Sequence, residues 1–218
     1  GESRSASDEV MIRLPRFTYV AARSIAEAVD HLAAAPADTM LLAGGTDLVP
    51  NMKRRQQVPR VVVGLRGVPE LRGLHVNGGL TLGTTTTLSE IVADDRIRTA
   101  CPGLWQAALQ VATPHLRNMA TLGGNLCLDT RCTYYDQSQE WRQAINFCMK
   151  KDGDTCWVAT SSPKCLAVSS TDTAPMLQAL GASVRLASTR GLRTIHVADL
   201  FANHGMHCSD LKLRARAQ

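Results

Sequence analysis

Five of the seven cysteines of this chain lie in one stretch of sequence that is polar and poor in aliphatic residues. They are Cys127, Cys132, Cys148, Cys156 and Cys165. Four thiolates are the ligand set that an iron–sulfur cluster requires. A structural zinc site more often contains cysteine pairs with only two residues between them, and this stretch contains no such pair.

The cysteine-rich stretch is too polar to build a hydrophobic core of its own. Ordering about 40 loop residues costs conformational entropy, which a bound cluster would offset by tying the loop to one centre. We therefore favour a cluster over a zinc ion, disulfide bonds or cysteines without a ligand. Cys127 closely follows a turn that contains a pair of glycines, and we interpret it as a small packed hydrophobic residue. Cys101 and Cys208 lie outside this stretch and are expected to be uninvolved.

Two pairs of glycines stand where the backbone can approach an anion. Glycine tolerates positive φ and lets a ligand come close, and the start of a helix presents N–H groups to a diphosphate. The G-x-G-x-x-G pattern of nicotinamide-dinucleotide sites is absent. Taken alone, each turn also suits an ordinary connection between a strand and a helix. The candidate residues are Ala43, Gly44, Gly45, Thr46, Asp47 and Leu48 in the first turn, and Thr121, Leu122, Gly123, Gly124 and Asn125 in the second.

Hydroxyl and carboxylate groups accompany the two glycine turns. Four consecutive threonines at 84–87 end a predicted strand, and the hydroxyls of Thr85 and Thr86 are candidates to bind phosphate or ribose. The same run suits a β-branched strand that leads into a helix cap. Asp172 is a candidate acceptor for a ribose hydroxyl or, equally, the N-cap of a helix.

The composition is that of an ordinary globular protein and excludes two classes of partner. Apolar residues make up 44% of the chain and the formal net charge is +5, without the broad basic stripe of a nucleic-acid-binding protein. No apolar run approaches the roughly 18 residues that cross a bilayer, and the first residues have no signal-peptide pattern. We therefore expect a cytoplasmic protein without nucleic-acid or membrane partners. In that compartment cysteines serve metal or redox chemistry more than disulfide bonds.

Capping and turn signals predict helices and strands throughout the chain. Residues 11–65 are predicted to form a compact α/β lobe. Its elements are a helix over 24–35, a strand over 39–43, a helix over 46–55 that Thr46 caps, and a strand over 60–65.

Beyond residue 65, hairpin strands and helices are predicted in place of the alternating strands and helices of the first lobe. Asn77 and Gly78 are a hairpin signal between two short strands, and Thr87 with Glu90 forms a capping box. Further elements are helices over 103–112 and 173–180 and strands over 182–187 and 193–197. The predicted domains are a leader at 1–10, a first lobe at 11–65, a second lobe at 66–202 with the cysteine-rich insert at 127–168, and an atypical tail at 203–218.

The order of these motifs resembles the FAD-binding subunits of the molybdenum hydroxylases, the family of xanthine dehydrogenase and carbon monoxide dehydrogenase. The resemblance rests on residues 43–48, 84–90, 116–125 and 172–175, and it extends over about residues 11–201. It implies an α+β, two-lobed FAD-binding fold of the CO dehydrogenase flavoprotein type. FAD is then expected between the lobes, with both glycine turns on its diphosphate and the segment around Leu122 near its ring.

The insert at 127–168 resembles one branch of that family, the β subunits of 4-hydroxybenzoyl-CoA reductases, whose insert binds a [4Fe–4S] cluster. Most other members pass directly from the second glycine turn to the Asp-x-x-Pro helix. The resemblance includes cysteine spacings of 16, 8 and 9 residues. It implies four cluster ligands, namely Cys132, Cys148, Cys156 and Cys165.

The resemblance implies that this chain transfers electrons and has no catalytic side chains of its own. Electrons would pass from ferredoxin through [4Fe–4S] and FAD to the other subunits, for reductive dehydroxylation of 4-hydroxybenzoyl-CoA to benzoyl-CoA in aromatic degradation. The implied partners are a molybdenum-cofactor subunit, a [2Fe–2S] subunit and ferredoxin. Lys150, Lys151 and Lys164 lie near cluster ligands in the sequence, and we expect them to form a basic rim where ferredoxin docks.

Two alternatives stay open. One is the FAD subunit of a related molybdenum hydroxylase with another substrate, because the substrate site lies on another polypeptide. The other is a truncated, non-catalytic cofactor-binding fragment. Members of the family continue into a C-terminal domain beyond the region of Phe201, and we expect that domain to be absent here.

Overall fold

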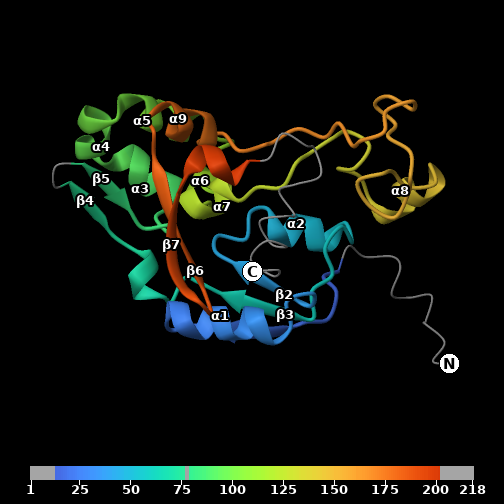
Figure 1. Cartoon of the computed structure of the whole chain (residues 1–218), viewed down its shortest axis with the longest axis horizontal. Coiled ribbons are helices and arrows are strands. Elements are labelled where there is room, and N and C mark those ends of the chain that lie inside the picture. Colours follow the sequence, from blue (N-terminus) through green and yellow to red (C-terminus); the bar gives the residue numbers. More distant parts are fainter. Residues whose placement is uncertain (1–12, 77–78, 202–218) are drawn as a thin grey trace.

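The computed structural model describes residues 13–76 and 79–201, which form a mixed α/β structure. A small sheet with its helices lies along one side of the molecule, and a group of helices with two hairpins lies along the other (Figure 1). The cysteine-rich insert projects from the group of helices as a separate lobe and carries the short helix α8 (Gln139–Ala144). The predicted leader at 1–10 and tail at 203–218 lie outside the described residues.

The sheet at the start of the chain is a βαβαβ unit, defined here as residues 18–64. Its strands are parallel in the order β1 (Thr18–Ala21), β3 (Val61–Gly64) and β2 (Thr39–Leu42), joined through α1 (Ile25–Ala34) and α2 (Leu48–Lys53). The predicted lobe contained both helices and the second and third strands. It lacked β1, because this edge strand is largely exposed and has no run of buried residues to mark it.

The central strand β3 is covered on both faces, as expected for a parallel sheet. Successive side chains of a strand point to opposite faces. Val63 packs with Ala28 of α1, whereas its neighbour Val62 packs with Leu48 and Met52 of α2. Thus the two helices bury opposite faces of the same three strands.

The second group of elements, called here the helical core, begins with the predicted hairpin. Strands β4 (Leu74–Val76) and β5 (Leu80–Leu82) pair antiparallel, and their turn at 77–78 lies outside the described residues. The predicted capping box is confirmed, since the Thr87 side chain accepts from the Glu90 N–H and the Glu90 carboxylate accepts from the Thr87 N–H. Helices α3 (Leu88–Ala93), α4 (Asp95–Ala100) and α5 (Pro102–Gln110) follow.

The helical core is completed by chain that follows the insert. Helix α9 packs beside α5, and the β6–β7 hairpin reaches from α9 back to α1 (Figure 1). Leu88, Ile91, Leu104 and Leu177 belong to one continuous apolar cluster across these elements. The remaining bounds are α6 (Pro114–Arg117), α7 (Leu122–Leu126), α9 (Ala174–Ala179), β6 (Ser183–Ser188), β7 (Gly191–His196) and the short 3-10 helices η2 (Pro69–Leu71) and η3 (Val197–Leu200).

Two predicted helix caps are wrong. Helix α2 begins at Leu48, so Asp47 and not Thr46 occupies the N-cap position, and no side chain caps it. Helix α9 begins at Ala174 with Thr173 at the N-cap, because the Asp172 carboxylate is bonded elsewhere. Within residues 13–76 and 79–201, no helix has both the length and the apolar character needed to cross a bilayer.

Candidate functional site

The first glycine turn, residues 43–48, joins β2 to α2 and leaves its backbone donors unused. Gly45 has φ +78°, a conformation that side chains rarely adopt. Among the described residues, no protein atom accepts a hydrogen bond from the backbone N–H groups of residues 44–48. The turn therefore offers an anion several N–H groups that the fold itself does not satisfy.

The two glycine turns meet in space, and Gly44 makes their contact. A Cβ at this position would lie 1.8 Å from the carbonyl oxygen of Met119, which only a shift of the backbone could relieve. Met119 stands just before the second turn in the sequence. Gly44 is thus required for the approach of two chain segments, in addition to any ligand that binds there.

The second glycine turn uses its N–H groups within the protein. The N–H of Leu122 donates to the Thr86 carbonyl at 2.9 Å, and that of Gly123 donates to the Thr84 carbonyl at 2.8 Å. The N–H of Gly124 donates to Oγ1 of Thr121 at 3.1 Å, which caps α7. The threonine run and the second turn therefore bind each other, and these three N–H groups are not free for a diphosphate.

Within the threonine run, the two candidate residues differ. The Thr85 hydroxyl donates to the Leu71 carbonyl at 2.8 Å, so it is left only with acceptor capacity toward a ligand. Thr86 is also buried, and its carbonyl belongs to the contact with the second turn. Burial of both side chains places them inside the protein and not on an open surface.

Asn125 connects the second glycine turn to the chain that returns from the insert. Its Oδ1 accepts from Oγ1 of Thr171 at 3.0 Å, from the N–H of Thr173 at 3.0 Å and from Oγ1 of Thr173 at 2.8 Å. Its Nδ2 donates to the carboxylate of Asp172 at 2.9 Å. The side chain is buried, so this one amide fixes the entry to α9.

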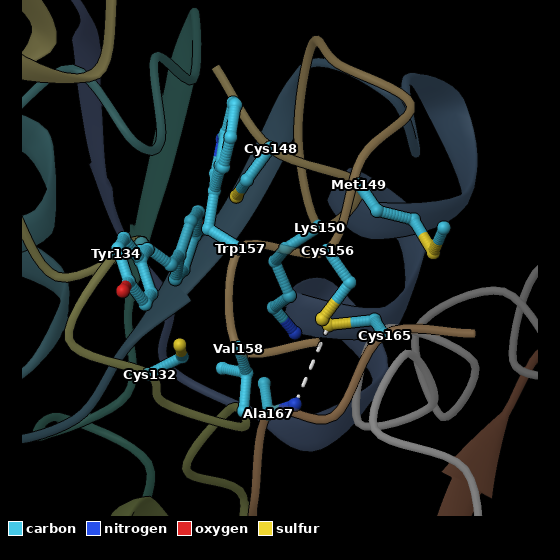
Figure 2. Close-up of a pocket in the computed structure, with 11 residues that line it drawn as sticks. Cys132, Tyr134, Cys148, Met149, Lys150, Cys156, Trp157, Val158, Cys165 and Ala167 are labelled. Carbon is cyan, nitrogen blue, oxygen red and sulfur yellow. Dashed lines mark hydrogen bonds between the residues drawn. The ribbon is translucent and has the colours of Figure 1, made fainter. Parts of the chain in front are cut away.

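The four predicted ligand cysteines line a single pocket in the insert (Figure 2). Cys148, Cys156 and Cys165 are buried and Cys132 is half-buried. The pocket brings together residues that are up to 33 positions apart in the sequence. Its other lining residues are Tyr134, Tyr135, Met149, Lys150, Trp157, Val158 and Ala167.

The donor set of this pocket is four cysteine thiols, and four thiolates are the ligands that an iron–sulfur cluster requires. Among the described residues, no three His, Cys, Asp or Glu side chains form a group that could hold one metal ion. The chemistry of the four side chains is therefore compatible with a cluster.

A backbone N–H group points at the sulfur of Cys165. The N–H of Ala167 donates to Sγ of Cys165 at 3.5 Å (Figure 2). Burial raises the pKa of the Cys156 thiol, but N–H groups of Ala159, Leu166 and Val158 outweigh it, so the net shift is downward. At Cys165 burial dominates and raises the pKa. Hydrogen bonds of this kind favour the thiolate, which is the form that ligates metal.

The interpretation of Cys127 as a packed residue is wrong, because Cys127 is exposed. It follows α7 directly, at the point where the chain leaves the helical core for the insert. Cys127 does not line the cysteine pocket, so the structure separates it from the four predicted ligands.

The predicted basic rim is also wrong. The ammonium of Lys150 donates to Oδ1 of Asp129 at 2.9 Å and also contacts the Thr130 hydroxyl, and its side chain is only 6% exposed. The ammonium of Lys151 donates to the carbonyls of Arg55 and Gln56 at 3.3 and 2.5 Å. Only Lys164 of the three is exposed. Two lysines therefore hold the insert in place and cannot form a docking surface.

The insert is fixed at its base and along one side. Arg131 and Val168 exchange two backbone hydrogen bonds, of 2.8 and 3.1 Å, where the insert begins and ends. The guanidinium of Arg131 also pairs with the carboxylate of Asp47 in the first glycine turn. In addition, Arg54 pairs with Asp136. The insert is thus attached to the βαβαβ unit beside the first turn.

The backbone on both sides of Cys148 adopts a conformation that no sequence pattern indicates. Asn146 and Phe147 have φ values of 61° and 58°, and Asp152 has 65°. Asparagine and aspartate tolerate this region, but for phenylalanine it is strained. The indole N–H of Trp157 donates to the Phe147 carbonyl at 2.5 Å and holds this bend beside the pocket. Strain of this kind often marks functional sites.

Comparison with known proteins places this architecture in a family. The family described as "FAD binding domain in molybdopterin dehydrogenase" matches residues 15–213. The chain belongs to this family. The expected fold is confirmed by solved structures of carbon monoxide dehydrogenase from Hydrogenophaga pseudoflava, where one chain gives a TM-score of 0.68 and 26% identity over 89% of this chain and 55% of its own. Quinoline 2-oxidoreductase from Pseudomonas putida 86 gives a TM-score of 0.65 and 25% identity over 88% of this chain and 54% of its own.

Curated relatives carry several different activities in their names. The carbon monoxide dehydrogenase medium chain of Hydrogenophaga pseudoflava is 36% identical over 51% of this chain and 39% of its own. The aldehyde oxidoreductase FAD-binding subunit PaoB of Escherichia coli K12 is 31% identical over 85% of this chain and 60% of its own. The chain therefore spans about two fifths to three fifths of the length of these relatives.

We predict that Asn125→Ala lowers the free energy of unfolding by about 3 kcal/mol or more, because it leaves several buried donors without an acceptor. Chemical denaturation followed by circular dichroism measures this change. Asn118→Ala is the control, since exposed Asn118 accepts one hydrogen bond from Ser89 and its loss should cost about 1 kcal/mol or less. Equal effects of the two substitutions would contradict the role of Asn125 in connecting the second turn to α9.

Proposed function

We propose that this chain binds FAD and transfers electrons within a molybdenum hydroxylase-type oxidoreductase complex. The first glycine turn carries the proposal, because its backbone N–H groups at 44–48 have no acceptor among the described residues and can face a diphosphate. Family membership supports the same cofactor. When bound, FAD supplies a centre that accepts and releases electrons singly or in pairs.

In the proposed FAD site the two glycine turns have different roles. Residues 43–48 hold the diphosphate through the backbone. The N–H groups of residues 122–124 in the second turn, residues 121–125, already have acceptors in the protein. This turn therefore borders the site without donating these hydrogen bonds to the cofactor. The threonine run and Asp172 border the same turn through hydrogen bonds, and their role is to fix it in place.

We further propose that Cys132, Cys148, Cys156 and Cys165 hold a [4Fe–4S] cluster. The supporting observation is that all four side chains line one pocket while Cys127 remains outside it. The backbone N–H of Ala167, which donates to the Cys165 sulfur, adds to the fit. When bound, such a cluster supplies a one-electron relay.

The complex that this chain serves is, in our proposal, a cytoplasmic reductase of the 4-hydroxybenzoyl-CoA type. The cysteine-bearing insert supports this choice, because its spacing of 16, 8 and 9 residues resembles that branch. The proposed partners are a molybdenum-cofactor subunit, a [2Fe–2S] subunit and ferredoxin. Relatives named for carbon monoxide, aldehyde and nicotine show that family membership alone does not define the substrate.

We predict that Gly45→Val weakens FAD binding by about 100-fold, because a branched side chain resists positive φ and crowds the turn. Titration of the purified chain with FAD, followed by flavin fluorescence, measures the dissociation constant. Gly191→Val is the matched control, since Gly191 also has positive φ but is the first residue of β7, with open space around it. Tight FAD binding by Gly45→Val would remove the first turn from the site.

For the cluster, the anaerobically prepared chain should contain about four iron and four sulfide atoms. Cys148→Ser and Cys156→Ser should lose most of this iron, because a serine oxygen replaces a thiolate ligand. Cys127→Ser should retain it, since Cys127 lies outside the pocket. Iron and sulfide analysis measures the cluster content of each variant, and electron paramagnetic resonance identifies the type of cluster. Retention of the full cluster in Cys148→Ser, or its loss in Cys127→Ser, would show that the ligand set is wrong.

The substrate proposal requires the assembled complex. Two electrons from reduced ferredoxin and two protons should convert 4-hydroxybenzoyl-CoA to benzoyl-CoA and water. Mass spectrometry of the thioester product checks this under anaerobic conditions. Turnover of a different aromatic substrate would favour a related hydroxylase. Failure of the chain to purify with a molybdenum subunit would favour a non-catalytic cofactor-binding fragment.

A further inference from the structure

Arg142 is a buried cation whose charge the protein does not balance. It lies on α8 in the insert, with only 2% of its surface exposed, and it is the largest of the fully buried side chains. Its Nη2 donates to the Arg54 carbonyl at 3.3 Å. Its Nε and Nη1 atoms have no hydrogen-bond partner, and no carboxylate of the described residues lies within 4.0 Å of the guanidinium.

Burying a guanidinium without a counter-ion costs free energy unless an anion binds beside it. A guanidinium stays charged at any pH that a protein experiences. Buried charges are normally paired, because an uncompensated one costs far more than an unpaired neutral group. The three unused N–H bonds on Nε and Nη1 and the missing counter-ion thus point to an anionic group that is not one of the protein's own carboxylates.

The acidic side chains around Arg142 are already engaged or exposed. Asp136 pairs with Arg54, and Asp129 pairs with Lys150. Glu140, the carboxylate on the same helix, is exposed to water. Tyr135 is close, but burial and the nearby Asp129 raise the pKa of its phenol, so it remains neutral. Of the groups that line the adjoining pocket, the four cysteines remain as a source of negative charge.

Tyr135 places Arg142 next to that pocket. The guanidinium carbon of Arg142 lies 6.0 Å from the centroid of the Tyr135 ring, and the same ring lines the pocket of the four cysteines. Lys150 lies 5.5 Å from this ring centroid as well, but Asp129 offsets its charge. Arg142 is therefore a buried cation beside a residue that lines the pocket, and no carboxylate of the described residues pairs with it.

We propose that Arg142 is the internal countercharge of the cysteine-bound cluster and raises its reduction potential. This inference rests on the proposed [4Fe–4S] site. A cluster with four thiolates is anionic and gains one further negative charge on reduction, so a fixed cation nearby favours the reduced form. Arg142 does not touch the sulfurs among the contacts described above. It acts through space, from a buried position 6.0 Å from the centroid of the Tyr135 ring.

The test compares Arg142→Met with Arg142→Lys and a matched control in the anaerobically reconstituted full chain. Redox titration with dithionite, monitored by electron paramagnetic resonance, reports the cluster potential. Arg142→Met should disfavour the reduced form by about tenfold, which is a decrease of about 59 mV for a one-electron couple. Arg142→Lys keeps the charge and should stay near the parent value. Arg98→Met is the control, because Arg98 is exposed and lies 5.2 Å from the Trp105 ring in the helical core.

A second measurement needs no cluster. In the iron-free chain, Arg142→Met should increase resistance to urea, since it removes a buried charge that nothing balances. In the loaded chain the same substitution should weaken cluster retention, measured as faster iron loss to a chelator. A purely structural arginine would destabilise both forms in the same direction.

The possible failures are distinguishable. A parent chain that takes up no iron and sulfide would overturn the proposed cluster together with this inference. A loaded Arg142→Met chain with the potential of the parent would overturn the inference alone. Equal destabilisation of the iron-free and loaded chains by Arg142→Met would do the same.

Discussion

The attachment of the insert to the βαβαβ unit determines how both candidate sites are arranged. Arg131 stands next to Cys132 in the sequence, and its guanidinium pairs with Asp47 in the first glycine turn. One ion pair therefore joins the segment that would carry the cluster to the segment that would carry the diphosphate. Hydrogen bonds from the Lys151 ammonium to two backbone carbonyls that follow α2 form a second attachment. Because these acceptors belong to the backbone, substitution of a side chain after α2 does not remove them.

The parts of the fold that sequence reasoning anticipated are those with local signals. The Thr87–Glu90 capping box and the strand of consecutive valines in β3 depend only on residues that are close in the sequence. The set of four cysteines was anticipated from the resemblance of their spacing to a cluster-binding insert, and the entropy of ordering a polar loop only indicated that some ligand was needed there. The exposed position of Cys127 was not anticipated, because a small residue after a helix gives no indication of its environment.

The features that sequence reasoning missed depend on distant partners. The N–H groups of the second glycine turn are occupied by carbonyls of the threonine run, about 35 residues earlier, and no local pattern announces this pairing. Likewise, Lys150 and Lys151 resembled surface cations, yet their partners Asp129 and Gln56 bury them in contacts. The burial of Arg142 could not be predicted for the same reason, because an arginine on a short polar helix becomes buried only through the packing of the whole insert.

The two backbone bonds between Arg131 and Val168 bring the ends of the insert side by side. A segment whose ends already meet can be gained or lost with little change in the geometry of its host, because the closure of the remaining loop is inexpensive. The insert is thus a segment that can be removed from, or added to, a protein of this fold. Joining residues 131 and 168 by a short turn would leave the flavin fold of the family continuous, and grafting residues 131–168 onto a relative would require, besides the graft itself, a carboxylate at position 47 and open carbonyls after α2.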